Sequence, residues 1–461
     1  MIRAFLNVRS QVHYHRSDSP LRSLVWFWLP AIVGVFTLVA AGCGGDDESA
    51  PTPSPTPASP TPIPTTPPGT FGPGVTETEI HLGMTSDIGG AGETPYAAVS
   101  LAVLAYFQKV NQEDGGVCGR QVVLTVEDDE YLAELALART QKLVREDEVL
   151  AVIGGLNTQA HADVAAFLND PDGDGDTADG VPDLFVSTGW SGWRNASKYP
   201  WTTSFIPEYL SDGRALAAYI AANLPDQKIG LLYRNDEFGQ DYLAAMEEAF
   251  GAEDNLFSQP FPIGDEDVSQ EISAVVESGA EVIVLASAPA VSADAIASAR
   301  GEGFDPQFLL SYVNQPSNLA SDLGGGPEAE AIIAGFEQLD GVLTTAYLLS
   351  AVEDENNTAI VEHLRIMETY GGPPASNLSI YGQSLAETVS ETLRRACQDL
   401  TRSAVMAAAE SLDGFHPSLL LPGIDVVLGE DDHAAIQAMQ VMRIIADGTL
   451  ESLGDPIDTG P

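Results

Sequence analysis

Short apolar runs alternate with amphipathic helical patterns along residues 79–312, and this alternation constrains the fold more than any other feature. The runs EIHLGM (79–84), VLAVIGG (149–155) and EVIVLA (281–286) predict strands, and a helical pattern follows each. Parallel strands joined by helices form sheets that helices cover on both faces. The pattern restarts near residue 211, so we predict an α/β protein made of two doubly wound lobes.

The strong negative charge excludes one large class of partners. The 461 residues include 67 acidic and 20 basic side chains, which give a formal net charge of −47. Such a surface repels the phosphates of DNA and RNA, so we expect no nucleic-acid partner. The acidic surface favours solubility outside the cell, and a specifically cationic partner is the alternative.

The amino terminus resembles an export signal. Four arginines precede the apolar run LVWFWLPAIVGVFTLVAAG, which ends at Cys43. A basic segment, an apolar segment and small residues before the cleavage point are typical of a secretory signal. LVAAGC resembles a bacterial lipobox, although Ala40 stands where leucine is usual. We therefore predict a lipoprotein signal peptide over residues 1–42 and a lipid anchor on Cys43. The alternative is a plain membrane anchor with an incidental cysteine.

The segment after Cys43 cannot form a core. Residues 43–74 hold proline at nearly every second position between 51 and 68, together with threonine and serine. Such chains populate extended polyproline II conformations. We predict a Pro/Thr-rich tether that holds a domain away from the cell membrane.

Several stretches, in this order and at suitable distances, carry a family resemblance. They are YFQKVNQEDGGVCGRQVVLTVEDD, KLVREDEVLAVIGGLNTQAHADVAAF, VPDLFVSTGW and KIGLLYRNDEFGQDYL. Together they resemble the type I periplasmic binding proteins, the leucine-binding-like receptors of ABC transporters. The late stretch LLLPGIDVVLGEDDHAAIQAMQVMRI resembles a subset associated with amides, aromatic acids or unknown ligands.

The resemblance implies an architecture and a function. It implies two lobes joined by three crossovers, with lobe 1 at 75–205 and 343–421 and lobe 2 at 206–342 and 422–461. The lobes would close around a small solute such as an amino acid, an amide or an aromatic acid. An ABC permease would receive the solute, with no chemistry performed on it. We expect an extracytoplasmic, lipid-anchored monomer that requires no cofactor.

The resemblance also places candidate ligand contacts in lobe 1. Thr158 matches a hydroxyl residue that binds ligand from a helix N-terminus, where unpaired N–H groups favour an oxygen atom. Asn157 or Thr158 also has the character of a helix cap, and the two roles are compatible. The remaining candidates are Gly189, Trp190 and Ser191 in STGWSGW, and Asp87 and Tyr96 after the first strand. Trp190 and Trp193 are either a ligand wall or ordinary packing.

In lobe 2 the resemblance implies three further contacts. Phe238 stands where the family usually has tyrosine, and Ala288 falls near the cleft. Tyr312 stands where amino-acid binders carry an acidic residue for the ligand ammonium, so it puts an α-amino acid ligand in doubt. Aromatic residues around a cleft favour a flat, partly apolar ligand.

Two cysteines remain once Cys43 is assigned to the lipid. Cys118 and Cys397 both map to the first lobe, near surface turns. Two cysteines in an exported domain can pair, so we predict a structural disulfide with two free thiols as the alternative.

The stretch NDPDGDGDTADGVPD resembles a calcium loop. Asp172, Asp174, Asp176 and Asp183 occupy positions one, three, five and twelve, but position six is Thr177 where the loop needs glycine. Counting from Asp170 corrects position six and loses the twelfth ligand. The loop is either a structural calcium site, with a dissociation constant on the order of 10⁻⁴–10⁻³ M, or a solvated acidic loop.

Enzymes and sensors are the competing classes. The sequence contains no G-x-S-x-G, H-E-x-x-H or G-K-[ST] motif, and its seven histidines are scattered, so we expect no enzyme activity. A ligand-binding sensory receptor of the same fold is the stronger alternative. Neighbouring permease genes would favour transport, and an adjacent kinase gene would favour sensing.

Overall fold

The computed structural model describes residues 70–460 except 89–95, 252–254, 266 and 351–355. The predicted signal peptide, Cys43 and residues 43–69 of the tether lie outside the described residues. The lipoprotein interpretation therefore stays a prediction. Among the helices that are described, none is long and apolar enough to cross a membrane.

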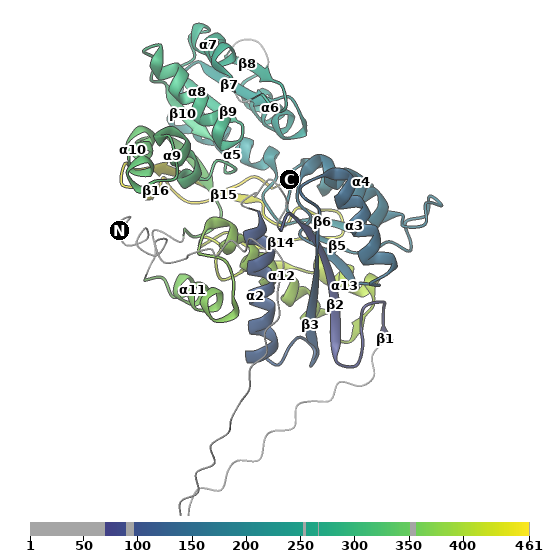
Figure 1. The fold of residues 1–461 in the computed structure, drawn as a ribbon. Coiled ribbons are helices and arrows are strands. Elements are labelled where there is room, and N and C mark those ends of the chain that lie inside the picture. The colour runs from purple at the N-terminus through teal and green to yellow at the C-terminus, as the bar shows by residue number, and fades with distance from the viewer. Residues whose placement is uncertain (1–69, 89–95, 252–254, 266, 351–355, 461) are drawn as a thin grey trace, which may run out of the picture. The chain divides into compact units, whose positions relative to one another are not determined.

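The first sheet is parallel, with strands in the order β3-β2-β4-β5-β6 (Figure 1). Its order reverses between β2 and β4, because the chain leaves β2 for β3 and then returns to the other side of β2. Helices cover both faces: α2 and α12 share one hydrophobic cluster with the sheet, and α3 and α4 share another. The bounds are β2 (Glu79–Ser86), β3 (Gln121–Asp128), β4 (Ala151–Ile153), β5 (Asp183–Val186), β6 (Thr202–Ser204), α2 (Ala97–Glu113), α3 (Ala133–Arg145), α4 (Thr158–Asn169) and α12 (Asn377–Arg395).

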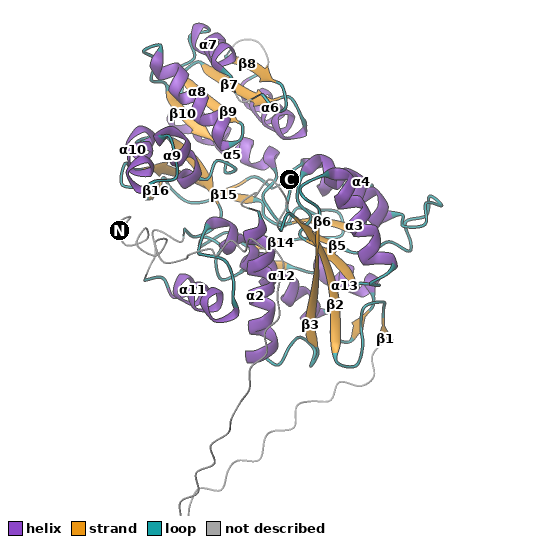
Figure 2. Ribbon diagram, in the orientation of Figure 1, coloured by secondary structure: helices purple, strands orange, loops and turns teal. Residues whose placement is uncertain are grey.

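The second sheet is mixed. Five parallel strands in the order β8-β7-β9-β10-β11 continue into β15, which is antiparallel to β11 (Figure 2). β16 and β17 each pair with β15 in the antiparallel sense. The bounds of these elements and of the helices of this lobe are β7 (Ile229–Arg234), β8 (Leu256–Phe261), β9 (Val282–Ala286), β10 (Gln307–Leu310), β11 (Leu343–Ala346), β15 (Ala438–Ile444), β16 (Leu450–Ser452), β17 (Ile457–Asp458), α5 (Tyr209–Asn223), α6 (Glu237–Phe250), α7 (Ser269–Glu277), α8 (Pro289–Gly301), α9 (Pro316–Gly324) and α10 (Ala329–Leu339).

The central strand β9 shows why its sequence is apolar throughout. Successive side chains of a strand point to opposite faces of the sheet. Val282 and Val284 pack in one hydrophobic cluster, which includes residues of α5 and α6. Ile283 and Leu285 pack in the other cluster, with residues of α7 and α8. Both faces are buried, so no position of this strand accepts a polar side chain.

The sequence pattern does not predict β8. Its residues Phe257 and Ser258 are exposed, and Pro260 lies within it. Proline cannot donate a ladder hydrogen bond and is confined to edge strands. β8 is the edge strand of its sheet, so it needs neither a continuous apolar run nor a complete set of donors.

The lobe boundaries differ from the prediction at two places. β11 pairs with β10, so residues 343–346 belong to lobe 2 and not to lobe 1. Residues 422–437 stay with lobe 1. There Ser204 forms a parallel β-bridge with Ala434, and the Ser204 N–H donates to the His433 carbonyl oxygen at 2.9 Å. The three crossovers follow β6, follow β11 and precede β15. Strand pairing determines these boundaries. The sequence does not predict them, because the paired strands are distant in the chain.

The end of the predicted tether belongs to the folded domain. β1 (Thr70–Phe71) pairs in parallel with β12 (Asp399–Leu400). Close by, a disulfide bond joins Cys118, in the turn between α2 and β3, to Cys397 after α12. The other elements of lobe 1 are η2 (Ser191–Arg194), α11 (Thr358–Tyr370), α13 (Arg402–Glu410), β13 (Asp413–Phe415) and β14 (Val426–Val427).

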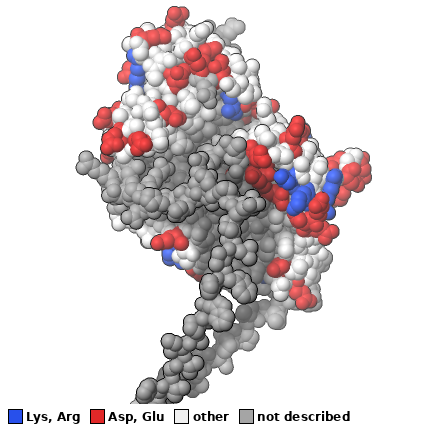
Figure 3. All heavy atoms as spheres, in the orientation of Figure 1, with Lys and Arg blue, Asp and Glu red and all other residues white. Residues whose placement is uncertain are grey.

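Acidic side chains outnumber basic ones on the face of the described residues shown in Figure 3. Figure 3 shows red carboxylate residues spread over this face and few blue basic ones. This distribution agrees with the formal charge of −47.

Candidate functional site

A cavity of about 400 Å³ lies beyond the carboxyl ends of the strands of both sheets. We call it the cleft. Open parallel sheets bind ligands at this edge, and the volume suits a small organic molecule. Residues that follow β4, β5, β7, β9, β10 and β11 line it, and the lining comprises Tyr96, Val99, Tyr131, Leu156, Asn157, Thr158, Gln159, Ser187, Thr188, Ile206, Tyr209, Arg234, Asp236, Phe238, Ile263, Ala288, Pro289, Tyr312, Val313, Gln315, Asn318, Tyr347, Leu348, Asn377, Leu378 and Tyr381.

The lobe 1 wall presents uncharged polar groups at the start of α4. Asn157 is the N-cap of this helix, and its side-chain oxygen accepts a hydrogen bond from the Ala160 N–H at 3.3 Å. Thr158 is the first helical residue, and its hydroxyl is hydrogen-bonded to the hydroxyl of Thr188. Asn157 therefore caps the helix, while Thr158 places a hydroxyl and the first free N–H groups of α4 at the cleft.

A second hydroxyl pair lies deeper in the same wall. The hydroxyls of Ser187, after β5, and Tyr381, from α12, are hydrogen-bonded to each other. Burial raises the pKa of Tyr381, so its phenol remains neutral at physiological pH. Neither residue follows from the family resemblance. Ser187 carries the signal of a strand end, whereas Tyr381 comes from a helix 194 residues further along the chain.

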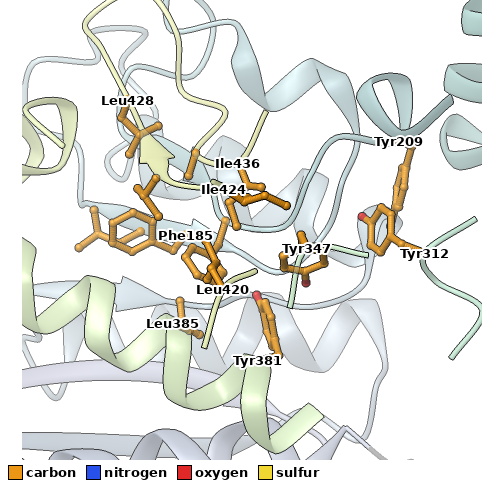
Figure 4. Packing of buried hydrophobic residues seen from close by; sticks show 14 of the residues in the cluster. Phe185, Tyr209, Tyr312, Tyr347, Tyr381, Leu385, Leu420, Ile424, Leu428 and Ile436 are labelled. Carbon is orange, nitrogen blue, oxygen red and sulfur yellow. The ribbon is translucent and has the colours of Figure 1, made fainter. Parts of the chain in front are cut away.

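Aromatic rings form the lobe 2 wall. Tyr209 stacks on Tyr312 with ring centroids 6.2 Å apart, and its edge meets Phe238 at 4.6 Å. The ring of Tyr347 lies 5.7 Å from that of Tyr312. Figure 4 shows these two side chains together with Tyr381. The Tyr312 hydroxyl donates to the Pro207 carbonyl oxygen at 2.7 Å. The phenol of Tyr312 is thereby satisfied by the protein, and its ring faces the cleft.

A buried carboxylate supports this aromatic wall from behind. Asp212, in the first turn of α5, is fully buried. It accepts hydrogen bonds from the Tyr312 N–H at 3.1 Å and from the hydroxyls of Tyr242 and Thr345. Burial raises the pKa of Asp212 to about 6, while these hydrogen bonds oppose the rise. The sequence hides this role, because an aspartate in the first turn of a helix is common without one.

Two of the described lining residues are charged, and both lie at the carboxyl end of β7. Arg234 ends the strand and Asp236 is the N-cap of α6. The Arg234 Nε donates to Asp236 Oδ2 at 2.7 Å. The Arg234 guanidinium lies over the ring of Phe238, 4.9 Å from its centroid. The family resemblance did not indicate this pair, although its place at a strand end was a signal for it.

Tyr96 forms the edge of the cleft with a residue that was not predicted. The rings of Tyr96 and Tyr131 stack 5.2 Å apart at 15°. Tyr131 has a left-handed backbone with φ of 58°, an unusual conformation for a bulky residue. Burial raises the pKa of both tyrosines. Ala288, the N-cap of α8, adds its backbone to the lobe 2 side.

Four predicted residues do not line the cleft. Gly189 lies behind the aromatic wall, where an added Cβ would come within 2.6 Å of the Pro207 carbonyl oxygen and 2.7 Å of the Tyr312 hydroxyl. Asp87 is buried directly after β2, where its charge adds to the larger effect of burial in raising the pKa of Asp129. The other two are Trp190 and Ser191.

Trp190 and Trp193 pack with each other in lobe 1. Their rings meet edge to face at 4.9 Å, and Tyr199 joins the same cluster. Trp193 is fully buried. The ligand-wall interpretation is therefore wrong for Trp193, and Trp190 is not among the residues that line the cleft. Packing of these large rings decided which way the loop turns.

Ser191 joins the two lobes outside the cleft. Its N–H and its hydroxyl donate to the two carboxylate oxygens of Asp241, at 2.8 and 2.7 Å. Asp241 belongs to α6 of lobe 2 and is 7% exposed. Burial raises the pKa of Asp241 to about 6, and the Ser191 hydrogen bonds oppose that rise. Ser191 thus contacts the partner lobe in the position where a ligand contact was expected.

The acidic loop differs from the predicted calcium ligand set. Asp170, Asp172 and Asp174 bring their oxygens within 4.8 Å of one another. Asp183 does not join them, because it lies buried in β5 and accepts hydrogen bonds from Thr202 at 2.9 Å and His161 at 2.8 Å. The twelfth ligand of that register is therefore wrong. Calcium binding by the remaining aspartates stays a prediction.

Comparisons with known proteins agree with this geometry. The model of a family described as periplasmic binding protein matches residues 79–449. A search of curated proteins found no match. The fold is similar to a branched-chain amino acid ABC transporter protein from Thermus thermophilus, solved with bound valine, at 18% identity and a TM-score of 0.68. That alignment covers 83% of this chain and 97% of the other.

Two further solved structures share the fold. A fatty acid ABC transporter substrate-binding protein from Thermomonospora curvata is 21% identical, with a TM-score of 0.65 and coverage of 85% of this chain and 94% of the other. A branched-chain amino acid transporter substrate-binding protein from Streptococcus pneumoniae, solved with isoleucine, is 16% identical, with a TM-score of 0.64 and coverage of 82% and 99%. At these identities the likeness concerns the fold.

Proposed function

Because the chain belongs to the periplasmic binding protein family, whose model it matches over residues 79–449, we propose that it captures a small organic solute in its cleft and delivers it to an ABC permease. The chain is a solute-binding protein and not an enzyme. The observation that carries the proposal is the cleft itself. Its walls come from both lobes, so closure of the lobes would enclose a solute, the motion typical of this family.

The lining favours a flat, partly apolar solute with polar atoms at one edge. Aromatic rings from lobe 2 offer faces for stacking and burial of apolar area. Hydroxyls and helix N–H groups from lobe 1 offer hydrogen bonds to an oxygen atom. Amino acids, amides and aromatic acids all combine these features, and the solved relatives carry valine or isoleucine or are named for fatty acids.

We further propose that the protein acts as a lipid-anchored monomer outside the cytoplasm. The leader pattern before Cys43 and the proline-rich tether support the anchor. Metabolic labelling with a fatty acid should mark the wild-type protein and leave Cys43→Ser unlabelled. Absence of label from the wild type, or equal label in both proteins, would contradict the lipid anchor.

A thermal-shift screen of the full chain in detergent tests the capture of a solute. A ligand that binds the folded state raises the melting temperature by mass action. Amides, aromatic acids and amino acids form the panel. Thr158→Ala and Tyr312→Ala should each reduce the shift given by a stabilising solute, because both residues line the cleft.

Thr358→Ala is the matched control. Thr358 is the first residue of α11 and follows the cap Asn357, as Thr158 follows Asn157 in α4, but it is exposed and outside the cleft lining. It should leave the shift unchanged. An equal loss in the Thr158 and Thr358 variants, or an unchanged shift in both cleft variants, would contradict this site.

A further inference from the structure

The two charged side chains of the cleft differ in how many of their polar atoms are hydrogen-bonded within the protein. Among the described residues that line the cleft, Arg234 and Asp236 are the charged ones. Asp236 Oδ1 accepts the Gly239 N–H at 3.2 Å as the cap of α6, and Oδ2 accepts the Arg234 Nε at 2.7 Å. Both carboxylate oxygens of Asp236 are therefore engaged, and its side chain is 7% exposed.

Arg234 retains donors that the protein does not use. Its ion pair with Asp236 goes through Nε, and within the described part of the chain neither Nη1 nor Nη2 makes a hydrogen bond. The side chain is 31% exposed, and its guanidinium lies over the Phe238 ring. A guanidinium donates in its own plane, in a fork that matches a carboxylate. The aromatic contact holds the fork in place without occupying these donors.

The described lining residues of the opposite wall include no anion. Tyr96 and Tyr131 of lobe 1 lie close enough to Arg234 for its positive charge to lower their pKa against the larger effect of burial. Both phenols remain neutral at physiological pH. Among the described lining residues, a solute between these walls therefore meets aromatic faces and one cation, and it meets no carboxylate with a free oxygen for an ammonium group.

We infer that Arg234 is a specificity-determining residue that binds the carboxylate of a flat organic acid without an ammonium group. This inference rests on the proposed capture of a solute and adds the charge class of that solute. The Nη donors of Arg234 would hold the carboxylate, and the rings of Phe238 and Tyr312 would cover the apolar part. Zwitterionic amino acids would bind more weakly, because their ammonium would be desolvated without a partner.

The negative charge of the protein as a whole does not oppose this assignment. Charges more than about 8–10 Å apart are largely screened at physiological ionic strength. The distant surface carboxylates therefore act mainly on the rate of encounter, while the direct contact with Arg234 decides the affinity.

The test compares matched solutes on the full chain in detergent. Benzoate and phenylacetate are the acids, benzamide and phenylacetamide are the neutral counterparts, and L-phenylalanine is the zwitterion. Isothermal titration and thermal shift measure binding to the wild type, to Arg234→Gln and to Arg234→Lys. We expect the acids to bind most tightly, with dissociation constants raised at least about tenfold in Arg234→Gln and less in Arg234→Lys.

Arg214→Gln is the control variant. Arg214 also lies in lobe 2, is 33% exposed and pairs with one carboxylate, Glu248 at 2.9 Å, but it does not line the cleft. It should leave every affinity within about twofold of the wild type.

The outcomes separate the two proposals. Binding of the amides or of L-phenylalanine as tightly as the acids, with no effect of Arg234→Gln, would overturn the role of Arg234 and leave solute capture intact. A loss of acid binding equal in Arg214→Gln and Arg234→Gln would also overturn it. The absence of a shift with all solutes would overturn both proposals, since the inference depends on capture.

Discussion

The two walls of the cleft offer different chemistry to a solute. The lobe 1 wall presents uncharged donors and acceptors, namely the hydroxyls of Thr158 and Ser187 and the first N–H groups of α4. The lobe 2 wall presents ring faces and the charged pair that includes Arg234. Apolar burial and a charge-assisted hydrogen bond each stabilise a complex more than one neutral hydrogen bond does. Lobe 2 should therefore set most of the affinity, and lobe 1 should orient the solute.

The two lobes are also held together differently. A disulfide bond between Cys118 and Cys397 crosslinks lobe 1. Within the described residues lobe 2 has no such bond, and the buried Asp212 links α5, α6, the loop after β10 and β11 through its hydrogen bonds. A covalent crosslink restricts the unfolded chain, whereas a buried carboxylate depends on all its donors being present. The aromatic wall of lobe 2 therefore depends on the hydrogen bonds of Asp212, whereas lobe 1 is stabilised by a covalent bond.

The largest expected effect comes from removing that network. Asp212→Ala leaves the Tyr242 and Thr345 hydroxyls and the Tyr312 N–H buried without an acceptor. We expect a loss of about 3–5 kcal/mol in the free energy of unfolding, measured by urea titration. Asp212→Asn keeps the shape and an acceptor oxygen and should lose less. A loss below about 1 kcal/mol in Asp212→Ala would show that lobe 2 does not depend on this residue.

Removal of the disulfide should destabilise lobe 1 by a smaller amount. Replacing Cys118 and Cys397 with serine should lower the free energy of unfolding by about 2–4 kcal/mol, because the bond restricts the unfolded chain between two residues 279 positions apart. Urea titration of the double variant measures the loss, and wild type under a thiol reductant is the control. Neither cysteine lines the cleft, so the affinity for a solute should stay within about twofold. A tenfold loss of affinity would link the crosslink to the site.

Stability should decrease from pH 5 to pH 7 through two buried carboxylates. Burial raises the pKa of Asp212 and of Asp241 from the ordinary value of 3.8 to about 6. The folded state therefore binds their protons more tightly than the unfolded state. Their contribution is fully present below about pH 4 and is lost as the pH rises through about 6. On the order of 1–3 kcal/mol of it is lost between pH 5 and pH 7.

Exposed carboxylates with lowered pKa, such as Glu113 and Asp267, act in the opposite direction but titrate below this range and contribute little. Burial lowers the pKa of His363, which opposes the decrease within the range, but it is one group against two. Chemical unfolding at pH 5, 6 and 7 measures the slope, and Asp241→Asn should reduce it. A free energy of unfolding that rises between pH 5 and pH 7 would contradict the assignment. So would an unchanged slope in Asp241→Asn.

The smallest effect is expected at Trp190. Trp190→Phe keeps an aromatic ring against Trp193 and Tyr199 and should cost about 1 kcal/mol or less. Because Trp190 does not line the cleft, solute affinity should not change. Titrating a solute that the wild type binds into Trp190→Phe and Phe238→Leu compares the loss of affinity for a residue outside the cleft with that for a residue inside it. A larger loss of affinity in the Trp190 variant would show that Trp190 contacts the ligand.

Much of the fold followed from periodicity. The fully apolar β9 and the alternating strands and helices predicted two parallel sheets, because a strand buried on both faces excludes polar residues at every position. The edge strand β8 escaped prediction, since an edge has one exposed side and tolerates Pro260. The lobe boundaries at residues 343 and 422 were wrong, because no local signal tells which sheet a strand or loop joins.

The site was predictable to the level of the loop. Thr158, Phe238, Ala288 and Tyr312 follow strand ends, and the structure places all four on the cleft. The loop after β5 shows where this reasoning ends: Gly189, Trp190 and Ser191 belong to it, yet none lines the cleft. Whether a loop residue faces a cavity depends on the packing beneath it, here on Trp193 and Asp241.

The sequence by itself determined the α/β class, the family resemblance and the strand ends at which a solute would bind, because these depend on local periodicity and on the order of short stretches. Tertiary structure alone decided that Asp212 supports Tyr312, that Ser191 reaches Asp241 and that Arg234 keeps free donors beside Phe238. These relations join residues far apart in the chain. Their energies arise from burial and from hydrogen-bond geometry, and both exist only once the elements have packed.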